Sequence, residues 1–500
     1  MGVPRWKEGR ETLVGGAAWS RVFLSCACAA GFLGLACIAV GIRNGSQVNH
    51  VAATWTAMAV DLSQGIFYRP LYSPEIGYGG TRFFPLFFSL QALLIKSGLA
   101  PIVAGHVVGL LSGALLLGGA HALLRRLSVA RPVAAGVTAL LLASGIVQHG
   151  FATIRGDILP LALNLWGFAA YLGARNERSR ILVPALLFTL AFAAKATALH
   201  GVVTMCLWLL VQGRKRDAAA ITGLVALGCS AVLAVTQVVS AGRFLAILRA
   251  CAAGGATPGS LLDAPRLLEG MFRWKEPWGY CLFGAACLAC LSRIRSCART
   301  LPGMFLAVSL GATVVLYGSP GITWNHLVDL VTASALLLGV AVGQAPPAHR
   351  RVLEPALLLL AAFAVLPGIT TLRQELAAAR EGAGQERRAV VVAIPAGSGD
   401  ILAEDPLLPI VAGERPYLLD AFMYRLVAER DPQFAVHLTD RIRARTFRAL
   451  VFQNDPRTHR SWYETVHFGP EVMRLVEENY EPDAQMGRYF IYRPRTPGRR

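Results

Sequence analysis

Apolar segments long enough to cross a bilayer recur between residues 22 and 370, and no other feature of the chain constrains its fold as much. A helix needs ~20 consecutive apolar residues to span the hydrocarbon core, and residues 22–42 are the first such segment. Over the whole chain 54% of the residues are hydrophobic and only 16% are charged, whereas soluble domains average about 25% charged residues. We therefore expect a mainly α-helical, polytopic membrane protein.

The positive charge of the chain is concentrated in short clusters between these segments. The formal net charge is +18, but residues 371–500 contain 19 Arg, no Lys and 18 acidic residues, which leaves a balance of only +1. Short basic loops between apolar segments are typical of the cytoplasmic side of a membrane protein. The charge therefore indicates membrane topology, and we expect the lipid bilayer, and not nucleic acid, as a partner.

The basic clusters alternate with polar loops in a pattern that predicts about eleven crossings, with the amino terminus in the cytoplasm and the carboxyl terminus outside. Residues 84–99 are predicted to form a shallow or re-entrant helix, although two full spans over residues 84–124 would also fit. The predicted spans are residues 22–42, 101–124, 132–148, 157–174, 181–194, 201–211, 218–239, 278–291, 301–317, 327–342 and 353–369.

The same pattern divides the chain into three parts. They are a cytoplasmic segment (1–21), a transmembrane domain (22–370) with outer loops at 43–83 and 240–276, and a small α/β domain outside the membrane (371–500). In the last part, the β-branched run at 387–395 predicts a strand. Residues 493–500 are expected to be disordered.

The cysteines show no pattern typical of a metal or redox site. Most of the ten lie within apolar segments, and none follows Cys297. Cys287 and Cys290 have the spacing of a CxxC motif, but no second pair or histidine lies nearby. We therefore expect them to be packing residues.

The stretch from residue 48 to residue 85 is the longest polar interruption before residue 240. Carboxylates, arginines and aromatic rings at a membrane surface suit a pocket for an anionic, partly apolar ligand. A loop with interfacial aromatics would explain the same composition, because Trp and Tyr favour that zone in any membrane protein. The polar residues are Asn49, His50, Asp61, Arg69, Glu75 and Arg82, and the aromatic residues are Trp55, Phe67, Tyr68, Tyr72 and Tyr78.

Further polar residues stand at the outer ends of the predicted spans. A charge within the hydrocarbon costs about 2.5–3.5 kcal/mol on insertion scales, so such residues mark function more often than loop charges do. The alternative is a set of ordinary helix-end residues, with Asp157 as an N-cap and Lys195 extending towards the interface. The group consists of Arg155, Asp157, Lys195, His200, Asn325, His326 and Asp329, and all of them are predicted on one membrane face.

Four short stretches resemble the GT-C superfamily of membrane glycosyltransferases, in particular the family 39 and aminoarabinose-transferase-like branch and the bacterial RgtA/B/C/D-like core-sugar transferases. They are YGGTRFFPL (78–86), IRGDILPLALNLWGFAAYL (154–172), LAFAAKATALHG (190–201) and WNHLVDLVTASALLLG (324–339). The resemblance covers about the first 370 residues. It implies transfer of a sugar from a polyprenyl-phosphate donor to a glycan, lipid or protein acceptor, at the outer face of a bacterial inner membrane.

One position departs from the family pattern. The family usually has an acidic residue just after the first span, whereas this chain has Asn49 and His50 there. The role of the base then passes to His50, Asp61 or Glu75, or the chain no longer catalyses. Asp157 resembles the acidic residue of the second outer loop and is the better match.

Sugar transfer from a lipid phosphate needs a base for the acceptor hydroxyl and cations for the leaving phosphate. The candidate catalytic residues are His50, Asp61, Glu75 and Asp157, and the candidate substrate-binding residues are Arg69, Tyr78, Arg82, Arg155, Lys195, His200, Asn325 and His326. The sequence motifs do not indicate a definite cofactor. A divalent metal (Mg²⁺ or Mn²⁺) held by Asp157 and a loop carboxylate would also fit the oxygen ligands.

Two other classes of protein fit part of the pattern. A lipid or sugar transporter or flippase would also carry charged residues in its spans, but usually near mid-membrane and in paired repeats. A non-catalytic GT-C-like membrane protein would explain Asn49 and His50 most simply. The charges of this chain gather at one face, which favours the transferase.

Overall fold

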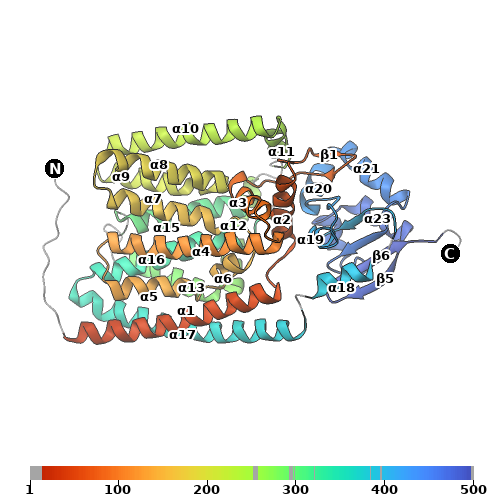
Figure 1. Cartoon of the computed structure of the whole chain (residues 1–500). Helices are drawn as coiled ribbons and strands as arrows, with labels where there is room; N and C mark the ends of the chain where they lie inside the picture. Colours follow the sequence, from red (N-terminus) through yellow and green to blue (C-terminus); the bar gives the residue numbers. More distant parts are fainter. Residues whose placement is uncertain are drawn as a thin grey trace.

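The computed structural model describes residues 14–251, 257–291, 297, 299–319, 321–382, 385–394 and 397–496. It consists of a bundle of roughly parallel helices and a smaller domain with a β-sheet at one end of that bundle (Figure 1). The bundle confirms the expected mainly α-helical class, and the sheet domain confirms the expected small α/β domain near the carboxyl terminus.

Each of the predicted spans coincides with a helix or with a bent pair of helices. Five helices are long and apolar enough to cross a membrane, or six if the bent pair α5–α6 is one span, among the residues described. The other apolar helices are shorter, so the eleven crossings stay a prediction. The bundle helices are α1 (Val14–Asn44), α4 (Pro101–Arg126), α5 (Arg131–Leu141), α6 (Gly145–Ala152), α7 (Ile158–Gly173), α8 (Glu177–Ala194), α9 (Leu199–Val211), α10 (Lys215–Val239), α13 (Pro277–Leu291), α15 (Leu301–Tyr317), α16 (Val328–Gln344) and α17 (Pro347–Arg380).

The predicted span at 132–148 is broken instead of continuous. α5 and α6 meet at an angle of 69°, and the break exposes backbone N–H groups at the start of α6. The buried carboxylate of Glu276 accepts a hydrogen bond from the backbone N–H of Ile146 at 2.7 Å. This side chain, which is 130 residues away in sequence, stabilises the new helix start.

Short elements cover the end of the bundle that faces the sheet domain (Figure 1). α3 has 12 residues, too few for a full crossing, and this agrees with the shallow helix predicted there. The outer loop predicted at 240–276 is largely helical where it is described. These elements are α2 (His50–Ser63), β1 (Tyr72–Ser73), β2 (Gly77–Tyr78), α3 (Pro85–Lys96), α11 (Arg243–Cys251) and α12 (Pro258–Lys275).

The sheet domain packs helices on both faces of four strands in the order β3-β4-β6-β5. β3 runs parallel to β4, whereas β6 is antiparallel to β4 and to β5. Separate apolar cores lie on the two faces. The elements are β3 (Ile401–Ala403), β4 (Ala449–Phe452), β5 (Tyr480–Met486), β6 (Tyr489–Pro494), α18 (Glu386–Ala393), α19 (Leu407–Val411), α20 (Ala421–Ala428), α21 (Pro432–Arg443), α22 (Arg460–Thr465) and α23 (Pro470–Asn479).

One local prediction for this domain is wrong, and a second is wrong in part. Residues 387–393 of the predicted strand lie in the helix α18, and residue 395 lies outside the described part. Arg387 and Val390 in the helix and Ile394 directly after it are buried, whereas Val392 is exposed. Apolar burial on one helix face therefore outweighs the β-propensity of the valines. The first residues of the predicted disordered tail, 493–494, complete strand β6, and residues 497–500 lie outside the described part.

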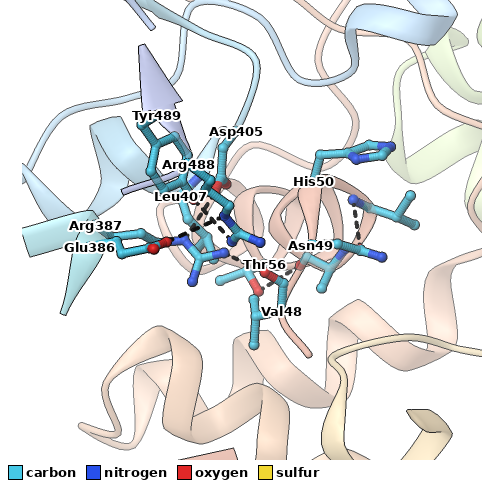
Figure 2. A network of polar contacts seen from close by, with 12 residues as sticks. Val48, Asn49, His50, Thr56, Glu386, Arg387, Asp405, Leu407, Arg488 and Tyr489 are labelled. Carbon is cyan, nitrogen blue, oxygen red and sulfur yellow. Dashed lines mark hydrogen bonds and ion pairs between the residues drawn. The ribbon is translucent and has the colours of Figure 1, made fainter. Parts of the chain in front are cut away.

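A buried polar network joins the sheet domain to the start of α2 (Figure 2). The guanidinium of Arg387 donates to the carbonyl of Val48 and, through Nε at 2.9 Å, to Asp405. The hydroxyl of Tyr489 donates to the same carboxylate at 2.6 Å. Burial alone would raise the pKa of Asp405, but Arg387 and Tyr489 outweigh this effect and lower it. The network fixes the domain against the bundle.

Candidate functional site

The carboxylate of Asp157 collects side chains from three separate parts of the bundle. Lys195, at the end of α8, donates from Nζ to Asp157 at 2.6 Å. Asn325, just before α16, donates from Nδ2 at 3.0 Å. Arg155 forms an ion pair through Nε at 3.1 Å. The structure therefore brings together four residues that the sequence places at the outer ends of its spans, here called the Asp157 cluster.

The cluster holds Asp157 as an anion. This residue lies in the loop between α6 and α7, and its side chain is only 12% exposed. Burial alone would favour the neutral carboxyl, but the ion pairs with Lys195 and Arg155 outweigh this effect and favour the anion. Asp157 makes no capping hydrogen bond to α7. The interpretation of this side chain as an ordinary N-cap is therefore wrong.

Arg82 and His326 lie beside the cluster. His326 follows Asn325, and its charged neighbours are Lys195, Asp157, Arg155 and Arg82. The guanidinium of Arg82 lies next to Gly321. It forms no hydrogen bond or ion pair with any residue in the described part of the chain. Arg82 is thus a cation at the edge of the cluster that has no hydrogen-bond or ion-pair partner among the described residues.

His200 and Asp329 extend the polar group along α9 and α16. Nε2 of His200 lies 3.4 Å from a carboxylate oxygen of Asp329. Nδ1 of His200 donates to the carbonyl of Thr197 at 2.9 Å, because that oxygen can only accept. Lys195 is among the charged neighbours of this histidine.

Asp61 and Arg69 pair with each other instead of entering the cluster. Two hydrogen bonds join them, at 2.5 and 2.9 Å, and both side chains are almost fully buried. Nη1 of Arg69 also donates to the carbonyls of Ile76 and Pro416, at 3.0 and 2.6 Å. This pair links α2 and the β1–β2 hairpin to the sheet domain.

We expect Asp61→Asn to lower the free energy of unfolding by ~3–5 kcal/mol, because removing one charge of a buried pair leaves the other uncompensated. Glu75→Gln is the matched control, since it makes the same chemical change at the exposed tip of the hairpin. Denaturant titration of the purified proteins in detergent would measure both values. Equal stability of the two variants would contradict a structural role for the Asp61–Arg69 pair.

Tyr78 and His50 also contact the sheet domain. Tyr78 is fully buried, and its hydroxyl donates to the carbonyl of Phe434 at 2.7 Å. The ring of His50 meets that of His467 edge to face, with centroids 5.2 Å apart. Burial lowers the pKa of His50, and the nearby His467 lowers it further. The contacts of these residues are made with the sheet domain and not with Asp157.

An apolar groove of about 570 Å³ runs along the bundle close to the cluster. Ala193, two residues before Lys195, forms part of its wall, and Pro85, three residues after Arg82, forms another part. Its remaining lining consists of Leu62, Phe67, Leu86, Ser89, Ala231, Val232, Val235, Thr236 and Val239. A cationic cluster and an apolar groove thus lie side by side.

No family model and no curated protein matches the sequence. Two crystal structures of ArnT from Cupriavidus metallidurans are similar. The one bound to undecaprenyl phosphate has a TM-score of 0.61 and 13% identity and covers 92% of this chain and 97% of that chain. The apo structure has a TM-score of 0.54 and 13% identity over 88% and 92%. Both are GT-C glycosyltransferases. This chain has the GT-C fold.

The archaeal oligosaccharyltransferase AglB from Archaeoglobus fulgidus, in complex with an inhibitory peptide and a dolichol-phosphate, is also similar. Its TM-score is 0.50 at 11% identity, over 97% of this chain and 75% of that chain. The GT-C fold predicted from four short sequence stretches is therefore confirmed, and the best-scoring of these structures, that of ArnT with undecaprenyl phosphate, covers 92% of this chain.

No cofactor is established for this chain, and a divalent metal at Asp157 stays a prediction. The described residues contain no group of three or more His, Cys, Asp or Glu side chains that could hold one. Two cations, Lys195 and Arg155, already occupy the carboxylate of Asp157. A Mg²⁺ or Mn²⁺ ion would have to displace them, so the donor set favours binding of an anion.

His149, on α6, is not among the candidate residues predicted from the sequence. Its side chain is 9% exposed, and its charged neighbours are Arg155 and Asp157. Its ring lies 5.1 Å from that of Trp324, measured between centroids. The available signal was its place in the segment HGFATIRGD, only eight residues before Asp157.

Proposed function

We propose that this GT-C-like chain is a membrane glycosyltransferase. It moves a sugar from a polyprenyl-phosphate donor to a cell-envelope acceptor at the outer face of the bacterial inner membrane. The observation that carries the proposal is the cationic cluster beside an apolar groove, on this fold. A phosphate attached to a long apolar chain matches both features at once.

The cluster is suited to a leaving phosphate. Asp157 neutralises one of its two bound cations, so Arg155 and Lys195 together retain a net positive charge beside it. Arg82 adds a guanidinium that has no hydrogen-bond or ion-pair partner in the part of the chain that the structure describes, and its fork can bind two phosphate oxygens. Preorganised cations stabilise the charge that develops as the sugar–phosphate bond breaks. Asn325 contacts Asp157 and His326 lies beside it, so we expect both to contact the sugar or its phosphate.

The groove is suited to the polyprenyl chain. Its lining is almost entirely apolar, and its volume of about 570 Å³ is sufficient for several isoprene units. The similar crystal structure of ArnT from Cupriavidus metallidurans is bound to undecaprenyl phosphate. Together these observations support undecaprenyl phosphate, or a related polyprenyl phosphate, as the carrier of the sugar.

The distribution of basic loops supports the outer face. The clusters at 125–131, 175–180 and 214–216 follow the ends of α4, α7 and α9. Residues of the Asp157 cluster stand at the opposite ends, namely the start of α7, the end of α8 and the start of α16. Because basic loops favour the cytoplasm, the cluster and the sheet domain belong outside.

Arg82→Lys should lower sugar transfer about 10- to 100-fold, because a hydrogen bond to a charged group contributes ~1.5–3 kcal/mol and lysine lacks the bidentate fork. The assay would follow release of undecaprenyl phosphate from a panel of undecaprenyl-phosphate-linked hexoses and pentoses, with cell envelope from a strain that lacks the chain as acceptor. Arg474→Lys, on the exposed face of α23, is the matched control. Normal transfer by Arg82→Lys would remove Arg82 from the site, and no transfer by the unaltered protein would refute the proposal.

A further inference from the structure

The orientation of the amide of Gln47 is fixed by a buried carboxylate. Nε2 of Gln47 donates to Glu375 on α17 at 2.5 Å. The other oxygen of this carboxylate accepts hydrogen bonds from Asn44 at 3.0 Å and Ser46 at 2.7 Å. A carboxylate only accepts, so the NH₂ group of Gln47 must face Glu375. The amide oxygen therefore points the other way.

This orientation determines where His149 carries its proton. Nδ1 of His149 lies 2.7 Å from Oε1 of Gln47. Because an amide oxygen cannot donate, Nδ1 must carry the hydrogen of this bond. In the neutral ring, Nε2 then has a free lone pair. Three side chains, Glu375, Gln47 and His149, thus form a relay that selects one tautomer.

Nε2 of His149 is buried and has no hydrogen-bond partner among the residues described. A buried nitrogen of this kind needs a partner, since an unsatisfied polar group costs ~1–3 kcal/mol. The ring is stacked at a tilt against Trp324, which immediately precedes Asn325 of the Asp157 cluster. The position of this free nitrogen therefore points to a ligand bound beside the cluster.

We propose that His149 is the general base of the transferase, and this inference rests on the function proposed above. Nε2 accepts the proton of the acceptor hydroxyl while that oxygen bonds to the anomeric carbon of the sugar. The bond from that carbon to the phosphate oxygen breaks, and polyprenyl phosphate leaves with the electron pair. His149 then passes its proton to the departing phosphate or to solvent, which restores the neutral ring.

Three of the four candidate catalytic residues predicted from the sequence are engaged elsewhere. Asp61 is paired with Arg69, and Asp157 is held by Lys195 and Arg155. His50 packs against His467 of the sheet domain. His149 combines a fixed tautomer with an acceptor nitrogen that has no hydrogen-bond partner among the described residues, whereas Nε2 of His200 faces the carboxylate of Asp329.

His149→Gln tests the proposal, because glutamine keeps a polar group of similar reach but cannot accept a proton at neutral pH. We expect sugar transfer to fall about 100-fold or more, the usual range for loss of a general base. Binding of undecaprenyl phosphate and the thermal melt should change little. His106→Gln is the matched control, since His106 is another buried histidine, on α4, and should retain transfer.

A second variant keeps the test informative if the glutamine is poorly tolerated. His149→Ala should be inactive and should regain part of its transfer in added imidazole, which a purely structural residue would not show. Transfer by His149→Gln at the normal rate, or no recovery of His149→Ala in imidazole, would overturn the role of His149 while leaving the transferase intact. Absence of transfer by the unaltered protein would overturn both proposals.

Discussion

Asp157→Asn is expected to remove sugar transfer and to destabilise the protein at the same time. The carboxylate neutralises Lys195 and Arg155 in a largely buried site, and an amide would leave both cations without their counter-charge. Losing one partner of a buried pair costs ~3–5 kcal/mol. Loss of preorganised electrostatics should lower turnover by about 100-fold or more. From sequence alone we predict an effect on activity without one on folding, and the observed contacts predict both.

Comparison with a double variant separates the two effects. Lys195→Met in the Asp157→Asn background removes one of the uncompensated cations. Stability should then recover in part, and the single variant Lys195→Met completes the double-mutant cycle that gives the coupling energy of the pair. Turnover should stay low, because the phosphate has lost a cation. Thermal melts and release of undecaprenyl phosphate would measure these quantities, and full turnover by Asp157→Asn would show that the cluster is structural only.

Ala231→Trp should block the apolar groove. Ala231 lies on the groove wall in α10, and its side chain is exposed, so the larger ring should not disturb the bundle core. The indole ring would occupy space that the polyprenyl chain needs, so kcat/KM for an undecaprenyl-linked donor should fall. A donor with a chain of only two isoprene units should be affected much less.

Ala234→Trp is the matched control for this experiment. Ala234 is an exposed alanine on the same helix, but it is not part of the groove lining. The control should use long and short donors as the unaltered protein does. If both tryptophan variants behave alike, or if chain length has no influence in Ala231→Trp, the polyprenyl chain binds elsewhere.

The sequence predicts the helices well because their signal is local. Each span is recognised from its own apolar residues, without knowledge of its neighbours. The outer-face cluster is predicted for a similar reason, since polar residues at helix ends must meet once the helices are parallel. Arg155, Asp157, Lys195 and Asn325 meet in this way. The break between α5 and α6 is missed, because it depends on Glu276, 130 residues away.

For some residues, the role predicted from the sequence differs from the role that the structure indicates. In each case the difference arises from contacts with residues far away in the sequence. His149 gains its significance from Gln47 and Glu375, which are 102 and 226 residues away in sequence. Asp61 and Arg69 look like ligand-binding residues in a polar loop, but the sheet domain buries them against Pro416. Neither the contacts of His149 nor the burial of Asp61 and Arg69 can be predicted from a local sequence pattern. These assignments require the packing of the sheet domain and of α17 against the bundle.

Binding of undecaprenyl phosphate, compared with undecaprenol, tests the central claim most directly, because the two lipids differ only in the phosphate. Native mass spectrometry of the purified protein would give both affinities. We expect the phosphate to bind at least about tenfold more tightly, since a hydrogen bond to a charged group contributes ~1.5–3 kcal/mol, and this preference should be lost in Lys195→Met. Equal affinity for the two lipids, or a preference unchanged in Lys195→Met, would contradict the assignment of the Asp157 cluster as the phosphate site.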